Sequence, residues 1–248
     1  MIPLFKSHYS IGKSILTFEE PSEKTKNRSI LSIAKDADLK DIVLVEDSLI
    51  GFLEARDGAR DHGLNLRFGL RISMSNEESK DSSCVHKIVI FAKNSLGCRL
   101  LNKIYTNAFT IGGGVLSEEY LKDIWDDSAL KLAIPFYDSF IFNNAMSFSS
   151  CTPDFSFADP IFFTENNNLP FDGLIEDEVD AYCDRNCHSI LETKSIFYKA
   201  KKDFSAYQTY KCICNRTFKT RDLTVPNFDH QGSDSFCFEE WLPTNEKK

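Results

Sequence analysis

Short apolar runs of the kind that form buried β-strands alternate along this chain with segments whose apolar residues recur every three or four positions. The first clear example is the run 42–45, Ile-Val-Leu-Val. It is followed by a helical pattern with Ser48 as its cap and Gly63 at its end. Such alternation is typical of a parallel sheet or a parallel barrel covered by helices. The sequence therefore predicts one α/β domain over residues 1–248, with about seven strands.

The same pattern places strands and helices along the rest of the chain. Strands are expected at 42–45, 66–74, 87–92, 130–135, 160–164 and 195–198, and helices at 48–62, 95–109, 117–121, 174–185 and 203–212. Ligands of parallel sheets and barrels bind at the carboxyl ends of the strands. Functional residues are therefore expected just after the last residue of each strand: Val45, Met74, Ala92, Pro135, Thr164 and Tyr198.

Composition restricts the location and the partners of the chain. Hydrophobic residues make up 42% of it and 21 residues are Phe, which is enough for a sizeable core. No apolar run approaches the ~20 residues that span a bilayer, and residues 1–6 lack the pattern of a signal peptide. These features predict a cytoplasmic protein with no membrane partner. The net charge of -8 predicts weak or indirect contact with nucleic acid, because proteins that grip DNA phosphates usually carry a basic excess.

The eight cysteines form no CxxC pair, which predicts reduced thiols rather than a disulfide framework. The alternative is a zinc site that uses four of them: Cys183, Cys187, Cys212 and Cys214. Their spacing differs from the CxxC pairs of structural zinc sites, so reduced thiols are favoured.

Motifs for nucleotide binding and for a nucleophile are incomplete. Residues 12–14, Gly-Lys-Ser, match the end of a phosphate-binding loop, but Ser7 stands where its first glycine belongs. No GxSxG pattern indicates a serine nucleophile. The five histidines form no HxH or HxxxH pair. His8 and His86 lie near strand ends, and a structural hydrogen-bonding role is favoured for both over a ligand role.

Several segments match one family pattern in order along the chain. Residues 8–12 (HYSIG), 44–51 (LVEDSLIG), 61–64 (DHGL) and 68–71 (FGLR) correspond to HSxYSLLDG, LTDHGNLFG, a helix ending in AGI, and IGVE. The closest match, 86–94 (HKIVIFAKN), corresponds to HLVLLAKN, and 97–104 follows like GYRNLMKL. Later segments at 163–170, 198–213 and 233–240 correspond to YLEIQ…LP, HYLRKEDAEAH…LLCI and SDQFYLKSPEEM. Over almost its whole length the chain thus resembles the PHP (polymerase and histidinol phosphatase) domain of the bacterial DNA polymerase III alpha subunit.

This resemblance implies a distorted (β/α)7 barrel, with neither a palm nor a polymerase domain within residues 1–248. Active members of the family bind metal ions at the barrel mouth and hydrolyse phosphoesters. In polymerases the domain is linked to 3′-5′ exonuclease proofreading or to structural support. The partners implied are replication proteins or the remainder of a polymerase.

The positions that hold metal in the family are altered in this chain. The opening HxH pair falls on Leu4 and Lys6 or, with a shift of two, on Lys6 and His8, so it is broken in either frame. The family's TDH falls on residues 45–47, where a carboxylate survives and the histidine does not. The glutamate of GVE is replaced by Arg71, and the late NDVH falls near 195–197. The degenerate ligand positions are Lys6, Arg71, Ser195 and Phe197.

A cluster of metal ions needs anionic and imidazole donors, and Arg71 instead adds a positive charge. We therefore expect no metal, no other cofactor and no catalytic residue, with Arg71 paired to Glu46 or Asp47 in place of the ions. The predicted function is a catalytically degenerate PHP domain with a structural or partner-binding role in DNA replication.

Two alternatives remain open. One is a metal-dependent phosphoesterase or 3′-5′ exonuclease whose zinc or manganese site is rebuilt from four weak candidates: His8, Asp47, His86 and Glu165. The other is a protein that binds phosphate or another small ligand through Arg71 and Lys6.

Overall fold

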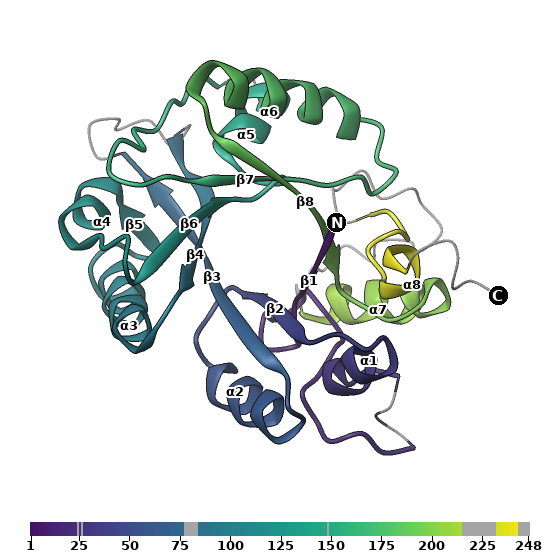
Figure 1. Cartoon of the computed structure of the whole chain (residues 1–248). Coiled ribbons are helices and arrows are strands. Elements are labelled where there is room, and N and C mark those ends of the chain that lie inside the picture. Colours follow the sequence, from purple (N-terminus) through teal and green to yellow (C-terminus); the bar gives the residue numbers. More distant parts are fainter. Residues whose placement is uncertain (24, 26, 77–83, 148, 215–231, 243–248) are drawn as a thin grey trace.

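Seven strands join edge to edge and close into a barrel at the centre of the molecule (Figure 1). The computed structural model describes all residues except 24, 26, 77–83, 148, 215–231 and 243–248. The ring runs β2-β1-β8-β7-β6-β4-β3, and pairing of β2 with β3 closes it. Its strands are β1 Ile2–Phe5, β2 Asp41–Glu46, β3 Asn65–Ser75, β4 His86–Ala92, β6 Leu130–Ile134, β7 Ile161–Thr164 and β8 Ser189–Ile196. The short β5, Val115–Ser117, pairs with the last residues of β3 outside this ring.

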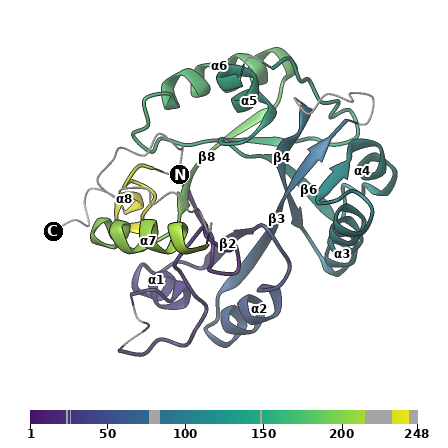
Figure 2. The same ribbon diagram turned by 180° about the vertical axis from the view of Figure 1, so that it is seen from behind.

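Helices surround the ring of strands in both views (Figures 1 and 2). They are α1 Ile30–Asp36, α2 Phe52–Asp61, α3 Ser95–Thr110, α4 Glu118–Ile124, α5 Phe140–Ser147, α6 Asp172–Asn186, α7 Phe204–Cys214 and α8 Phe238–Trp241. In α3 the Asn94 side chain accepts a hydrogen bond from the Gly97 N–H at 3.0 Å, which caps the first turn. Leu101, Ile104 and Ala108 follow at helical spacing and are buried against the barrel, which is why this segment forms a covering helix.

The prediction of an α/β barrel is confirmed, but the prediction that its strands are all parallel is wrong. β4 pairs antiparallel with both β3 and β6. The reason lies in the sequence 76–85 between β3 and β4, which is shorter than the connection of about a dozen residues that a parallel crossover needs. Ala92, at the end of β4, therefore lies at the opposite end of the barrel from Val45 and Thr164. The functional site expected after Ala92 is thus not at the barrel end where the parallel strands finish, which we call the mouth.

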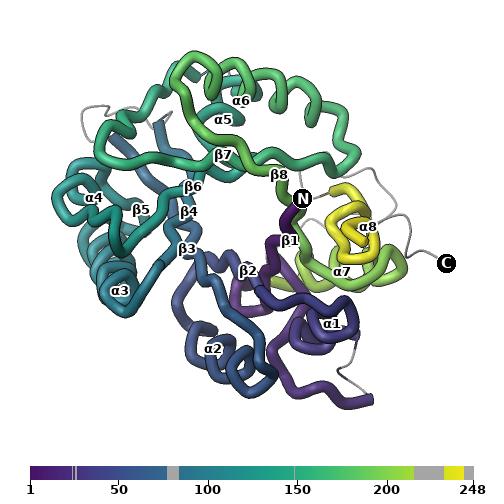
Figure 3. Tube along the Cα trace, in the orientation of Figure 1, coloured from purple at the N-terminus to yellow at the C-terminus, as the bar shows by residue number. Residues whose placement is uncertain are grey.

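Several elements differ from the predicted boundaries. The strand predicted at 195–198 is the end of β8, which begins at Ser189. Its beginning was missed because only two apolar residues, Ile190 and Leu191, precede the polar Glu192, Thr193 and Lys194. Strand β1 and helix α1 were not predicted. β1 is only four residues long, yet it lies between β2 and β8, which brings the N-terminus beside a strand from the C-terminal half (Figure 3).

The barrel has two cores, one on each side of its wall. The larger lies between the outward faces of the strands and the helices. The smaller fills the barrel interior and consists of Leu4, Val45, Val89, Ala133 and Phe163, one from each of five strands. Because side chains alternate along a strand, the next inward positions toward the carboxyl ends lie directly above this apolar layer. They carry charges.

Candidate functional site at the barrel mouth

Four charged residues meet above the apolar interior, and we call Lys6, Asp47, Arg71 and Asp138 the mouth cluster. Lys6 follows β1, Asp47 follows β2, Arg71 lies in β3 and Asp138 lies after β6. The Asp47 carboxylate accepts hydrogen bonds from Lys6 Nζ at 3.1 Å and from Arg71 Nη1 at 3.4 Å. The second guanidinium nitrogen, Arg71 Nη2, forms an ion pair with Asp138. Opposite charges thus alternate across the mouth.

The two cations of this cluster are almost fully covered. The exposed fraction is 8% for the Lys6 side chain and 12% for Arg71. Burial lowers the pKa of Lys6 and opposes ionisation of Asp47, but Lys6 and Arg71 outweigh this at Asp47 and hold its pKa below the usual range. Burial likewise disfavours the Arg71 guanidinium, yet Asp47 and Asp138 raise its pKa. The cluster is held together by charges that neutralise one another.

The pairing expected between Arg71 and Asp47 is confirmed, whereas Glu46 serves another purpose. The Glu46 carboxylate is completely buried and accepts hydrogen bonds from the Ser7 N–H at 2.7 Å and from the Ser10 hydroxyl. Burial raises its pKa. The Ser10 hydroxyl also accepts from the Asp47 N–H at 2.9 Å, so this contact fixes the loop that carries the mouth cluster.

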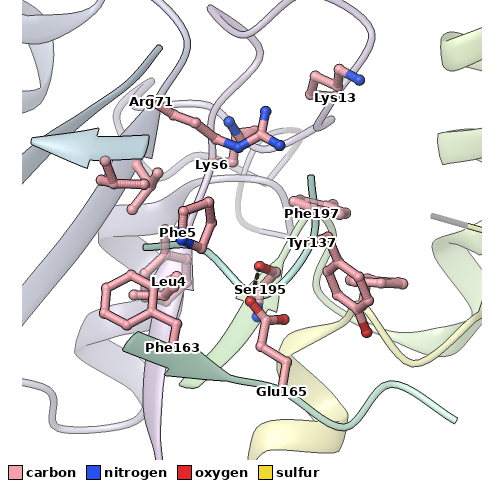
Figure 4. A pocket seen from close by; sticks show the side chains of 14 residues that line it. Leu4, Phe5, Lys6, Lys13, Arg71, Tyr137, Phe163, Glu165, Ser195 and Phe197 are labelled. Atoms are coloured by element: carbon pink, nitrogen blue, oxygen red, sulfur yellow. Dashed lines mark hydrogen bonds between the residues drawn. The ribbon is translucent and has the colours of Figure 1, made fainter. Parts of the chain in front are cut away.

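A cavity of about 50 Å³ lies beneath the mouth cluster, with Lys6, Arg71 and Lys13 toward one end and Glu165 and Ser195 toward the other (Figure 4). Such a volume holds a few water molecules. Lys87 adds another cation beside Arg71, where its ammonium group donates to the Ser73 hydroxyl at 2.7 Å and burial lowers its pKa.

Glu165 closes the other end of this cavity and is held by its neighbours. Its carboxylate accepts from the Ser195 N–H at 3.0 Å, the Ser195 hydroxyl at 2.8 Å and Asn167 Nδ2 at 3.0 Å. Burial raises its pKa. Ser195, which the resemblance aligns with a metal-ligand position, donates to a protein carboxylate. Phe197, aligned with another such position, stacks on Phe236 with ring centroids 5.1 Å apart.

A second buried carboxylate, Asp172 at the start of α6, extends this polar network. It accepts from the Tyr137 hydroxyl at 2.9 Å and from the N–H groups of Asn167 at 2.8 Å and Leu169 at 3.0 Å. Asn167 Nδ2 also donates to the Tyr137 oxygen at 2.9 Å. The network fixes the loop between β7 and α6 and, with it, the position of Glu165.

The two candidate histidines lie apart from the mouth cluster. His8 Nδ1 is 3.3 Å from the Leu16 carbonyl, and the ring packs on Tyr9. His86 is buried, with Nδ1 3.2 Å from the Cys84 carbonyl and its ring edge against Phe140. Burial lowers its pKa to about 4. Within the described part of the chain, no hydrogen bond or ion pair joins His8, Asp47, His86 and Glu165 to one another.

The described residues contain no group of three or more His, Cys, Asp and Glu side chains that could hold a metal ion. This applies to the four weak candidates and to the cysteine set of the zinc alternative. Cys183 is buried in α6, Cys187 is exposed at its end, and Cys212 and Cys214 lie in α7.

Sequence reasoning missed several residues of the site. Tyr137 and Asp138 follow the predicted strand 130–135 closely, and Asn167 follows β7, so the strand-end rule pointed to these loops without selecting residues in them. Asp172 carried no signal of its own, because an acidic residue in the first turn of a helix is usually solvated. In the sequence Lys87 has no feature that distinguishes it from other strand residues. Only the antiparallel direction of β4 places it at the mouth.

No family model matches this chain, and no curated protein matches it. Over the described residues, no helix is both long enough and apolar enough to cross a membrane.

Proposed function

We propose that this chain is a catalytically degenerate PHP-like domain over residues 1–248, with a distorted (β/α)7 barrel, and that it supports DNA replication by a structural or partner-binding role. The family assignment and the replication role rest on the sequence resemblance. The observation that carries the non-catalytic role is the mouth cluster, in which Lys6 and Arg71 occupy family ligand positions and pair with Asp47 and Asp138.

This arrangement opposes binding of a divalent ion for an electrostatic reason. Asp47 is the surviving carboxylate of the family's TDH segment, and it already neutralises two buried cations. A divalent ion at this place would meet the positive charges of Lys6 and Arg71 in a poorly solvated region, where repulsion is strong. Glu165 offers no substitute, because its oxygens accept hydrogen bonds from Ser195 and Asn167.

The partner proposed for this module is a protein, either a replication protein or the remainder of a polymerase. The net charge of -8 favours contact with proteins over contact with DNA phosphates. Proximity labelling with the tagged chain in the cell that carries it is expected to enrich replication proteins. If the natural chain enriches only proteins unrelated to replication, the proposed replication role is wrong. The non-catalytic role is tested separately by the next experiment.

The absence of catalysis is tested by metal content and turnover of the purified chain. After dialysis against zinc or manganese, we expect substoichiometric metal and no hydrolysis of a phosphomonoester or of single-stranded DNA above the blank. A double variant, Lys6→His with Arg71→Glu, restores two family ligand types and removes two cations, so it should bind more metal than the natural chain. Stoichiometric metal in the natural chain, with turnover that Asp47→Ala abolishes, would establish the phosphoesterase or exonuclease alternative instead.

Phosphate binding is the second candidate function, and the excess of cations at the mouth favours it. Lys13 and Lys87 add two positive charges near Arg71 to the paired charges of the mouth cluster. Inorganic phosphate at millimolar concentration should then raise the Tm of the natural chain, and Lys13→Ala should weaken that effect. Lys35→Ala, a change at the far end of α1, is the matched control. An equal response of the natural chain to chloride at the same ionic strength would exclude a phosphate site.

A further inference from the structure

Two cysteines that are far apart in the sequence meet outside the barrel wall. Cys84 lies just before β4, and Cys151 lies between α5 and β7. The Cys151 thiol donates a hydrogen bond to the Cys84 carbonyl with an Sγ to O distance of 3.7 Å, and it also interacts with the Cys84 side chain. Cys84 is partly exposed, whereas only 3% of Cys151 is exposed. Cys84 is thus the more exposed of the two cysteines.

Hydrogen bonds fix both backbones at this meeting point. Asn144 accepts from the Cys151 N–H at 3.0 Å through Oδ1 and donates to the Cys151 carbonyl at 2.7 Å through Nδ2. Its neighbour Asn143 donates to the Val85 carbonyl at 3.1 Å, which ties α5 to the residue after Cys84. His86 Nδ1 lies 4.0 Å from the Cys151 sulfur. Hydrogen bonds of the folded chain thus hold the two cysteines next to each other.

We propose that Cys84 and Cys151 are an oxidisable thiol pair that forms an intramolecular disulfide with a small-molecule disulfide such as oxidised glutathione. The Cys84 thiolate attacks one sulfur of the oxidant, the oxidant's S–S bond breaks, and one glutathione thiolate leaves. The Cys151 sulfur then attacks Cys84 in the mixed disulfide and releases the second glutathione. The protons of the two protein thiols end on the two glutathiones, so two thiols and one oxidised glutathione become one protein disulfide and two reduced glutathiones.

A disulfide is favoured over a metal at this place. Two thiols with one imidazole do not complete the four ligands of a structural zinc site, and the described residues hold no group of three metal-binding side chains. The cross-link would join the segment that leads into Lys87 to the segment that follows Asp138. These two residues already share a backbone hydrogen bond, from the Lys87 N–H to the Asp138 carbonyl, at 2.8 Å. Oxidation would therefore fasten two segments that carry charges of the barrel mouth.

The test is disulfide mapping on the full chain. After incubation with oxidised glutathione and blocking of the remaining thiols, a non-reducing digest should yield a peptide pair cross-linked between Cys84 and Cys151. Closing so long a loop should raise Tm by roughly 5–10 °C, and dithiothreitol should reverse the rise. Cys84→Ser and Cys151→Ala should each abolish both effects. Cys183→Ser, which removes another buried thiol, should leave both intact.

Two results would overturn the proposal. One is a folded chain in which Cys84 accumulates as a stable glutathione adduct while Cys151 stays reduced. The other is an oxidation-dependent rise of Tm that persists in Cys84→Ser. Because Cys151 is buried, its variant is judged only if circular dichroism matches that of the natural chain, and Cys84→Ser decides the question in either case.

Discussion

An Asp47→Ala variant is expected to lose about 2–4 kcal/mol of unfolding free energy, because it leaves the buried Lys6 ammonium without its ion-pair partner. Removing one member of a fully buried pair costs about 3–5 kcal/mol. The value expected here is lower because 28% of the Asp47 side chain is exposed and solvent screens part of the interaction. Arg71 would keep Asp138 as its partner. Denaturant unfolding followed by circular dichroism measures the loss.

Asp41→Ala is the matched control, because Asp41 also pairs with an arginine across β2 and β3. Its partner Arg67 is 67% exposed, so this change should alter the unfolding free energy by only about 0–1 kcal/mol. A double variant, Lys6→Met with Asp47→Leu, removes both charges and should lose less stability than Asp47→Ala alone. Equal losses of unfolding free energy in Asp47→Ala and Asp41→Ala would show that burial does not strengthen the ion pairs of the mouth cluster.

The Asp47 contribution should also depend on pH. Its pKa in the folded chain lies below the ordinary value of 3.8, so the ionised form is favoured by folding. The contribution of Asp47 to the free energy of unfolding is complete above the pKa that Asp47 has in the unfolded chain. It is lost as the pH falls through the pKa that Asp47 has in the folded chain. The stability difference between the natural chain and Asp47→Ala should therefore be constant near neutral pH and shrink below about pH 4. A difference that grows on acidification would contradict this assignment.

An Asp172→Ala variant is expected to lose about 3–5 kcal/mol, since it removes a buried carboxylate that accepts three hydrogen bonds. The Tyr137 hydroxyl and the N–H groups of Asn167 and Leu169 would lose that acceptor. Because Asn167 also positions Glu165, the change should loosen the loop between β7 and α6. Hydrogen exchange of the Asn167 and Leu169 amides, together with denaturant unfolding, measures both effects.

Asp177→Ala provides the comparison in the same helix, because Asp177 is exposed, and this change should lie within about 0.5 kcal/mol of the natural chain. Asp172→Asn keeps one acceptor oxygen, so its loss of unfolding free energy should lie between those of Asp172→Ala and Asp177→Ala. If amide exchange at Asn167 is unchanged in Asp172→Ala, the carboxylate does not hold this loop.

The predicted site and the observed one overlap at Lys6, Asp47 and Arg71. Asp47 could be placed at the mouth because it closely follows the predicted strand 42–45. Lys6 and Arg71 were placed there by the resemblance, since β1 was not predicted and Arg71 lies within β3. Asp138 and Asp172 lie in or after loops, where no periodicity sets direction. Their partners, Arg71 and Tyr137, are 67 and 35 residues away in sequence, so only folding brings the pairs together.

The sequence by itself determined that strands alternate with helices, that an arginine is present at position 71, and that Asp47 is available to neutralise it. These are local properties, set by hydrophobic period and by residue identity. Only the tertiary structure decided that β4 runs against its neighbours, that Asp138 takes the second side of Arg71, and that Cys84 meets Cys151. Each of these depends on which strands become neighbours when the barrel closes, and strand order is a long-range property that no local pattern encodes.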